Sequence, residues 1–231
     1  MEAIILAGGF GSRLRSVISD TPKPMAPIAN KPFLCFLFEY LIKNEVNKVI
    51  LSVGYRYEKI VEYYGNQYKG ISIAYSYESR PLGTGGGIKK ALAQVCSDDV
   101  FILNGDTYFD VNLSSLLQKH TDTNADITLS LKPMCYYNRY GSVTTMGDRV
   151  VRFEEKKFKE YGNINGGVYI AKSSIFDKVE MPEKFSFEAD FLDRNVETLK
   201  IHAFIADSYF IDIGIPEDYE KAQKELPVLY E

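Results

Sequence analysis

Residues 6–25 read Leu-Ala-Gly-Gly-Phe-Gly-Ser-Arg-Leu-Arg-Ser-Val-Ile-Ser-Asp-Thr-Pro-Lys-Pro-Met, and they carry the strongest pattern in the chain. A short apolar run, residues 3–6, leads directly into three glycines. Arg13 follows the glycines, and Lys23 stands ten residues later between two prolines. Glycines allow backbone N–H groups to approach an anion closely, and fixed cations nearby can hold the negative charge of a triphosphate. The segment therefore predicts a buried strand that ends in a polyphosphate-binding loop.

Strand-like apolar runs alternate with helical patterns through the first half of the chain. The expected strands are residues 3–7, 49–53, 71–75, 100–103 and 127–131. The expected helices are residues 32–43, 57–64, 84–95 and 114–120. This βαβα order is typical of a parallel sheet with helices on both faces. The predicted fold class is α/β, with a Rossmann-like, mostly parallel central sheet.

The second half has shorter β-type runs. They are residues 142–145, 150–154, 164–170, 201–205 and 210–213, with helices expected at 187–199 and 216–224. We expect these runs to form an added mixed β layer that builds a pocket wall on the central sheet. No linker, repeat or low-complexity stretch interrupts the sequence, so residues 1–231 are interpreted as one domain.

Composition excludes several classes of function. The net charge is −4, from 27 basic and 31 acidic residues without a basic stripe, so no nucleic-acid partner is expected. No signal sequence is visible and no apolar run approaches the roughly 20 residues that span a bilayer, so we expect a cytoplasmic protein without a membrane partner. Cys35, Cys96 and Cys135 match neither a disulfide framework nor a zinc site. His120 and His202 are isolated and are interpreted as packed or solvated side chains. Homo-oligomerisation is left open by the sequence.

Three segments fall at the carboxyl ends of expected strands, where ligands bind in open α/β sheets. They are residues 8–13, residues 78–87 and Asn104-Gly105-Asp106. The first is not a dinucleotide-binding fingerprint, because Leu14 stands where the third glycine is required. The G-x-x-x-x-G-K-[ST] loop of P-loop proteins is also absent.

The motif Gly8-Gly9-x-Gly11-x-Arg13-Leu14, followed by Pro22-Lys23-Pro24, resembles the signature of sugar-phosphate nucleotidyltransferases. The resemblance continues through residues 81–86, 104–106, 165–167 and 212–219 and so covers nearly the whole chain. It implies a nucleotide-binding half at about residues 1–131 and a sugar-phosphate-binding half at about residues 132–231. It also implies Mg²⁺ as cofactor, with a nucleoside triphosphate and a sugar 1-phosphate as substrates.

The resemblance also implies a role for each matching residue. Arg13 would neutralise the departing pyrophosphate, and Lys23 would bridge the α-phosphate and the sugar 1-phosphate. Asp106 and Asp212 would share the Mg²⁺, although on their own they also fit a turn residue and a surface residue. The nucleotide-binding positions would be Leu6, Ala7, Gly8, Gly9, Gly11, Ser12, Glu78, Gly83, Thr84 and Asn104. The sugar-phosphate-binding positions would be Gly141, Glu155, Lys156, Asn165 and Gly167.

Glu78 indicates which base is used. It stands five positions before Gly83, where pyrimidine-using relatives often carry glutamine. A carboxylate only accepts hydrogen bonds, and guanine offers two adjacent donors, N1–H and the N2 amine. Uracil or thymine would place carbonyl oxygens against the same carboxylate. We therefore predict that Glu78 selects GTP, the alternative being a solvated loop glutamate.

The predicted reaction joins GTP to a hexose or heptose 1-phosphate, giving a GDP-sugar for surface polysaccharide assembly and pyrophosphate. The resemblance favours D-glycero-α-D-manno-heptose 1-phosphate, then mannose 1-phosphate, and then a UTP- or dTTP-dependent enzyme. A GT-A glycosyltransferase is a rival, but Asp106-Thr107-Tyr108 lacks its second carboxylate. A non-catalytic nucleotide-sugar sensor is a second rival. Such a protein would be expected to lose Arg13, Lys23 or one of the two aspartates, and all four are present. Departures from the family pattern are Ser16-Val17-Ile18, Lys157, Phe210 and Ile215, none of which removes a charged catalytic group.

Overall fold

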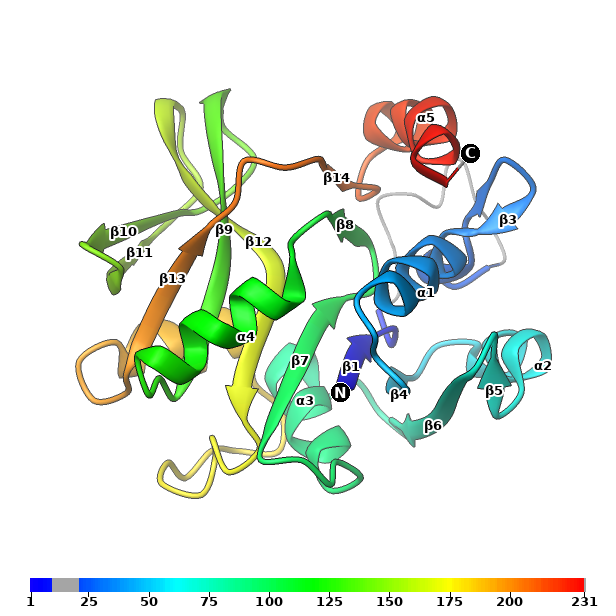
Figure 1. Ribbon diagram of the computed structural model, residues 1–231, viewed down its shortest axis with the longest axis horizontal. Helices are drawn as coiled ribbons and strands as arrows, with labels where there is room; N and C mark the ends of the chain where they lie inside the picture. The colour runs from blue at the N-terminus through cyan, green and yellow to red at the C-terminus, as the bar shows by residue number, and fades with distance from the viewer. Residues whose placement is uncertain (10–20, 231) are drawn as a thin grey trace.

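A ten-stranded mixed sheet runs through the computed structural model, which describes residues 1–9 and 21–230 (Figure 1). The strand order is β10-β11-β13-β9-β12-β7-β1-β4-β6-β5. The strand bounds are β1 Glu2–Leu6, β4 Lys48–Val53, β5 Gln67–Tyr68, β6 Ile71–Tyr77, β7 Asp99–Asn104, β9 Ile127–Tyr137, β10 Ser142–Met146, β11 Arg149–Glu154, β12 Lys159–Lys172 and β13 Ile201–Ile205. Two short pairs lie outside this sheet: β2 Pro27–Ile28 with β3 Lys31–Pro32, and β8 Thr107–Phe109 with β14 Phe210–Asp212.

Strands β7, β1, β4 and β6 form a parallel core, as predicted, and the two-residue strand β5 is antiparallel to β6. β1 pairs in parallel with β4 and β7, and β4 pairs in parallel with β6. Strands covered on both faces read as continuous apolar runs, and their side chains alternate between the two layers. Ala3 and Ile5 join the core cluster that includes helix α1 (Phe33–Lys43), whereas Ile4 joins the cluster that includes helix α3 (Gly83–Leu92). The helices therefore cover opposite faces of one buried strand.

The second half was expected to add a mixed β layer on the central sheet, and its strands instead extend the sheet at its edge. β12 pairs antiparallel with both β7 and β9, so the later strands extend the same sheet. Within residues 1–9 and 21–230 the sheet is therefore mixed and not mostly parallel. The physical reason is that the open edge of β7 carries unpaired backbone groups, and β12 satisfies them. Period-2 patterns predict strands but not which strands pair, so this connection was not visible in the sequence.

Most expected helices are present, and all of them except α2 (Tyr57–Tyr64) have one or both ends shifted by one to three residues. They are α1, α2, α3, α4 (Leu113–Asp122) and α5 (Pro216–Glu225). The helix expected at residues 187–199 is wrong in type and length. A π-helix, η3 (Phe187–Leu192), and a 3₁₀ turn, η4 (Asp193–Asn195), stand there instead. The described residues also contain two short 3₁₀ turns, η2 (Lys23–Met25) and η5 (Pro227–Tyr230). No helix in the described part of the chain is long and apolar enough to cross a membrane.

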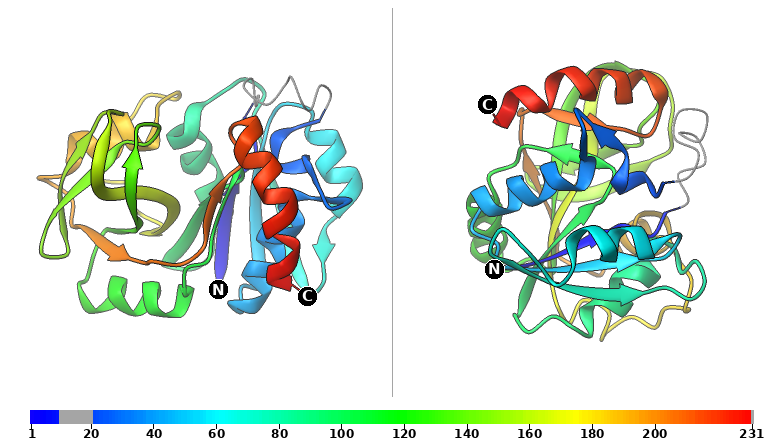
Figure 2. Two further views of the ribbon diagram at one scale, coloured as in Figure 1. Left: turned by 90° about the horizontal axis from the view of Figure 1, so that it is seen from above. Right: turned by 90° about the vertical axis from the view of Figure 1, so that its right-hand side faces the viewer.

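The C-terminal helix returns to the first half of the chain, where Figure 2 shows it in red beside the blue N-terminal segments. Tyr219 on α5 donates a hydrogen bond to the Pro27 carbonyl at 2.5 Å. Tyr230 donates another to the Phe36 carbonyl on α1 at 3.2 Å. This return places β14, which immediately precedes α5, close to the loop that carries Lys23.

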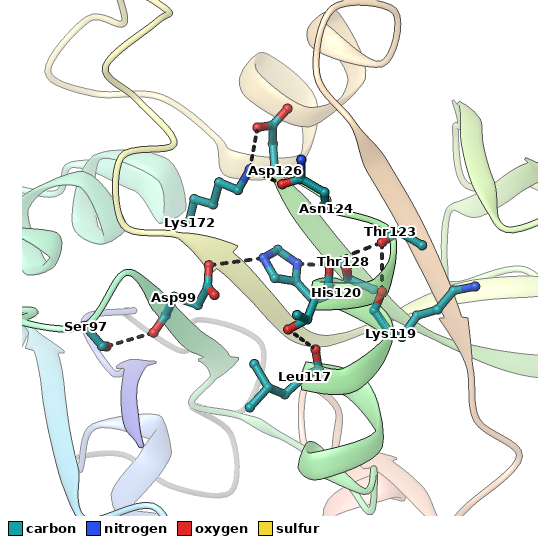
Figure 3. Close-up of polar contacts among 11 residues, drawn as sticks. Ser97, Asp99, Leu117, Lys119, His120, Thr123, Asn124, Asp126, Thr128 and Lys172 are labelled. Carbon is teal, nitrogen blue, oxygen red and sulfur yellow. Dashed lines mark hydrogen bonds and ion pairs between the residues drawn. The ribbon is translucent and has the colours of Figure 1, made fainter.

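His120 is a packed residue, as the sequence indicated. Its ring on α4 lies between Thr128 of β9, 3.0 Å from Nδ1, and Asp99 of β7, 3.3 Å from Nε2 (Figure 3). Burial, the largest influence, lowers the pKa of His120, although Asp99 opposes the shift. The histidine joins a helix to two strands of the sheet through both ring nitrogens.

Candidate active site

A cavity of about 320 Å³ lies at the carboxyl ends of β1, β6 and β7. All three segments singled out in the sequence contribute to its wall, because parallel strands end at the same edge of a sheet. The predicted residues that line it are Leu6, Gly8, Gly9, Lys23, Glu78, Gly83, Thr84, Asn104 and Asp106. Ala7 is buried and donates its backbone N–H to the Ser52 carbonyl at 2.8 Å. Gly11, Ser12 and Arg13 lie outside the described residues.

Glu78 forms the part of this wall next to the glycine loop. A Cβ placed on Gly8 would lie 2.9 Å from Oε1 of Glu78. That oxygen accepts a hydrogen bond from the Ser52 hydroxyl at 3.0 Å, and Oε2 accepts one from the Leu82 N–H at 3.0 Å. The two donors fix the plane of the carboxylate. Since each carboxylate oxygen has two acceptor sites, both oxygens can still accept from a ligand.

The N-terminus of α3 opens into the same cavity. Gly83 has φ +74°, and a Cβ at this position would lie 2.4 Å from the Phe185 carbonyl oxygen, so only glycine fits. Thr84 follows in the first turn, and its hydroxyl donates to Oε2 of Glu188 at 2.9 Å. The Gly85 N–H donates to the Phe185 carbonyl at 3.0 Å. The other N–H groups of this first turn and the positive end of the helix dipole favour an anionic ligand.

Lys23, Asp106 and Asp212 meet at one edge of the cavity. The Lys23 ammonium lies 2.5 Å from Oδ2 of Asp106 and 3.8 Å from Oδ1 of Asp212. The pairing of β8 with β14 brings the two aspartates together, because Asp212 is opposite Thr107 and the Ile213 N–H donates to the Asp106 carbonyl at 3.0 Å. Two carboxylates separated by more than a hundred residues thus share one lysine.

The groups around Asp212 shift its pKa in opposite directions. Burial, followed by the nearby Asp106 carboxylate, raises the pKa of Asp212. Lys23, the Gly214 N–H at 2.8 Å and Arg139 act in the other direction. Within residues 1–9 and 21–230, no cluster of three or more His, Cys, Asp or Glu side chains is placed to hold a metal ion. The edge offers two carboxylates, and a cation there would need further oxygen ligands from water or substrate.

A second cavity, of about 560 Å³, gathers four of the five predicted sugar-phosphate residues. They are Gly141, Glu155, Lys156 and Asn165. Glu155 and Lys156 are exposed, whereas the adjacent Glu154 is held by Lys157 at 2.9 Å and Lys159 at 2.8 Å. The hydrogen bonds from these lysines, with Lys159 first, lower the pKa of Glu154 to about 2.

Gly167, the fifth of these residues, lies at the boundary between the two cavities. It has φ +73°, and a Cβ on it would lie 2.6 Å from Nδ2 of Asn104, a residue of the first cavity. Its N–H donates to Oδ1 of Asn165, a residue of the second cavity, at 3.1 Å. This close approach of strand β12 to the end of β7 is compatible only with glycine.

Sequence reasoning missed two residues: Glu188 at the second cavity, and Arg139 at a further cavity that Asp212 also lines. Glu188 lines the second cavity and contacts Thr84 of the first. Arg139 stands two positions before Gly141, lies 2.5 Å from Asp218 on α5, and has its guanidinium 5.3 Å from the centre of the Tyr140 ring. Neither residue belongs to a glycine motif or a charge run, so only an alignment of relatives could have marked them.

The comparisons with known proteins agree over the whole length of the chain. The family model described as "Nucleotidyl transferase" matches residues 2–227. The chain is 57% identical over 226 residues to D-glycero-α-D-manno-heptose 1-phosphate guanylyltransferase of Aneurinibacillus thermoaerophilus, covering 98% of both chains. It is 52% identical to the enzyme of the same name from Campylobacter jejuni, covering 95% of this chain and 97% of the other.

A solved structure has the same fold. The crystal structure of HddC from Yersinia pseudotuberculosis complexed with GMP-PN superposes with a TM-score of 0.86 at 38% sequence identity. The superposition covers 97% of this chain and 98% of that chain. From the match of the family model and the near-complete coverage of these relatives, the chain belongs to the nucleotidyl transferase family.

Proposed function

We propose that the protein transfers GMP from GTP to D-glycero-α-D-manno-heptose 1-phosphate, giving the GDP-heptose and pyrophosphate. The observation that carries this proposal is the meeting of Lys23, Asp106 and Asp212 beside a cavity at the ends of the parallel strands. The identity of 57% to a relative that bears this activity in its name supports the choice of substrates.

The chemistry brings two anions together. A phosphate oxygen of the sugar phosphate attacks the α-phosphorus of GTP, a P–O bond forms there, and the bond to pyrophosphate breaks. The site must supply positive charge and an in-line arrangement, and it needs no covalent nucleophile. Lys23 would hold the α-phosphate and the sugar phosphate, with the N–H groups of Gly8 and Gly9 and the first turn of α3 on the other phosphates. Arg13 remains a prediction for the departing pyrophosphate, and Gly11 remains one for the nucleotide phosphates.

Glu78 would select guanine. Its carboxylate is held in one plane by Ser52 and Leu82, next to Gly8 in the cavity wall. A fixed acceptor-only group suits the paired N1–H and N2 donors of guanine and repels the carbonyl oxygens of a pyrimidine. The rigid orientation matters because a mobile carboxylate would discriminate less between bases.

The second cavity would bind the sugar phosphate. Asn165 and Glu155 can hydrogen-bond sugar hydroxyls, and Lys156 can reach a phosphate at the rim. Gly141 and Gly167 would let the backbone approach the sugar closely. Under this proposal residues 1–131 form the nucleotide-binding half and residues 132–231 the sugar-phosphate-binding half, with Gly167 packed at the boundary.

The family typically uses a divalent metal ion, and we propose Mg²⁺ held by Asp106 and Asp212. The donor set fits a hard cation, since both side chains offer carboxylate oxygens and neither sulfur nor imidazole lies among them. Burial is the main cause of the raised pKa of Asp212, and repulsion from Asp106 adds to it; a cation would relieve that repulsion. When bound, the ion supplies positive charge to the phosphate oxygens.

The test is a screen of ATP, CTP, GTP, UTP and dTTP against the heptose 1-phosphate and mannose 1-phosphate. Pyrophosphate release is the measurement, with each sugar phosphate omitted in turn. We expect the highest kcat/KM for GTP with the heptose 1-phosphate and no release without a sugar phosphate. A higher kcat/KM with mannose 1-phosphate would replace the sugar assignment, and a preference for UTP or dTTP would refute the role of Glu78.

A further inference from the structure

The π-helix η3 places two carboxylates on the wall of the second cavity. Glu188 and Asp193 both line that cavity, and the Asp193 N–H donates to the Glu188 carbonyl. This hydrogen bond between residues i and i+5 closes one π turn, so the two side chains lie one turn apart on the same side of the helix. In an α-helix of about 3.6 residues per turn they would point roughly 140° apart. The π-helix is therefore what brings Asp193 to the cavity.

The Asp193 carboxylate is available to a ligand, whereas its neighbours are occupied. It is exposed, and in the described part of the chain it has no hydrogen-bond or ion-pair partner. The adjacent Arg194 is bound to Asp190 instead, at 3.0 Å. Both oxygens of Glu188 accept hydrogen bonds from hydroxyl groups, and Glu154 binds two lysines. A hydroxyl that entered the cavity could therefore be bound by Asp193 without displacing a protein group.

The second cavity has a near end, which lies beside the proposed reaction centre. Tyr140 lines this cavity and also lines, together with Asp212, a neighbouring cavity of about 260 Å³. On the opposite wall, Glu188 accepts from the hydroxyl of Thr84, a residue of the first cavity, at 2.9 Å. A sugar 1-phosphate whose phosphate reaches Lys23 must therefore place that phosphate at this end of the cavity.

Asp193 lies farther along the cavity, toward the tip of the β10–β11 hairpin. Strand β11 begins at Arg149 beside the hairpin turn and ends at Glu154, whose carbonyl packs against Gly141 near Tyr140. These two ends are about 17 Å apart at the usual rise of a strand. Arg149 donates to two carbonyls in the segment just after η4, at 3.2 and 2.8 Å. The chain from η3 through Asp193 to these carbonyls thus leads away from the reaction centre.

The two sugars under consideration differ in the side chain that leaves the ring at C5. In mannose this side chain is C6 with one hydroxyl, whereas in the heptose it is one carbon longer and carries hydroxyls on both C6 and C7. Two adjacent hydroxyls offer two O–H donors, and a carboxylate can accept one on each oxygen. Hydrogen bonds to an ionised group are also stronger than those between neutral groups.

We propose that Asp193 is the residue that selects the heptose over mannose, by accepting hydrogen bonds from the C6–C7 diol. The inference rests on the proposed function for the reaction and for the near end as the phosphate position. With the phosphate held there, the longer side chain of the heptose reaches a part of the cavity that mannose leaves empty. Glu155 follows Glu154 at the near end of β11 and remains the partner proposed for the other sugar hydroxyls.

The test measures kcat/KM for the heptose 1-phosphate and for mannose 1-phosphate at saturating GTP, by pyrophosphate release. In the parent protein the ratio of the two values should favour the heptose. Asp193→Ala should lower this ratio about 10-fold, because a hydrogen bond to a charged group is lost with the heptose and not with mannose. Asp193→Asn keeps one acceptor oxygen in the same place and should lower the ratio by less.

Glu197→Ala is the matched control, since it removes an exposed carboxylate that follows η4 and is not among the residues that line the cavity. It should keep the parent ratio. An unchanged ratio in Asp193→Ala would overturn the inference, and so would an equal loss with both sugar phosphates, which indicates a structural role. A parent protein that uses neither sugar phosphate, or that prefers mannose 1-phosphate, refutes the proposed function itself. That failure is seen in the parent, whereas failure of the inference is seen only in the variants.

Discussion

Replacing Lys23 with methionine tests the electrostatics of the proposed catalytic edge. The substitution removes the ammonium with little change in volume. At an effective dielectric constant of about 20, the attraction is about 7 kcal/mol to Asp106 and about 4 kcal/mol to Asp212 at the observed distances. Desolvation of the ammonium, which is 11% exposed, offsets much of this, and solvent screens Asp106, which is 37% exposed. We therefore expect a net loss of about 2–4 kcal/mol in the free energy of unfolding.

The measurement is urea unfolding at pH 7.5 in EDTA, repeated in millimolar Mg²⁺. Mg²⁺ should stabilise Lys23→Met more than the parent, because the ammonium no longer competes for the two carboxylates. The variant should also lose about 10³-fold or more in kcat/KM, as is usual when a group that stabilises transition-state charge is removed. Lys31→Met, a change of an exposed lysine on β3, is the control and should unfold like the parent. A Lys23→Met protein as stable as the parent in EDTA would refute this electrostatic reasoning, whatever its activity.

Three further predictions concern other parts of the molecule. Glu78→Gln should lower the ratio of kcat/KM for GTP to that for UTP by about 10-fold or more, since each lost or mispaired hydrogen bond costs about 1–3 kcal/mol; an unchanged ratio would contradict the base selection. Gly83→Ala should lower the free energy of unfolding in urea by about 1–3 kcal/mol. The loss should exceed that of Gly65→Ala, because Gly65 has a similar positive φ but open space where a Cβ would lie. Equal losses would show that the contact with Phe185 adds nothing to the cost. Because burial lowers the pKa of His120 from its ordinary 6.5, the folded state binds fewer protons than the unfolded state, so the Tm should fall as the pH drops below about 6.5. His120→Gln should make the Tm fall less steeply as the pH drops. If the Tm of this variant depends on pH as it does in the parent protein, His120 is not the group responsible.

The local elements were predictable where a periodic pattern was long enough. The helix at Tyr57–Tyr64 and the strand at Ile201–Ile205 have the predicted ends. β5 and β8 are two and three residues long and give no periodic signal. The helix expected over residues 187–199 is a π-helix at Phe187–Leu192 followed by a 3₁₀ turn at Asp193–Asn195, because a helical sequence pattern does not distinguish these hydrogen-bonding patterns.

The same distinction holds for the candidate site: residues that belong to a local motif could be predicted, and residues placed by distant contacts could not. Asp106 could be selected because it directly follows a buried strand, and Lys23 because two prolines flank it in a family motif. Glu188 could not be selected, since its partner Thr84 lies 104 positions away and its partner Tyr169 lies 19 positions away. Contacts of this kind depend on how α3, η3 and β12 pack against one another, which no local pattern encodes.

The strand β12 restricts how the enzyme can respond to its substrates. Residues Val168 to Lys172 are paired with β7, and the same strand is paired with β9 along most of its length. A hinge motion that closed one half of the molecule onto the other would have to break this backbone ladder, at about 1 kcal/mol for each hydrogen bond. Any compaction on substrate binding is therefore confined to loops, and small-angle X-ray scattering should record nearly the same radius of gyration with and without ligands.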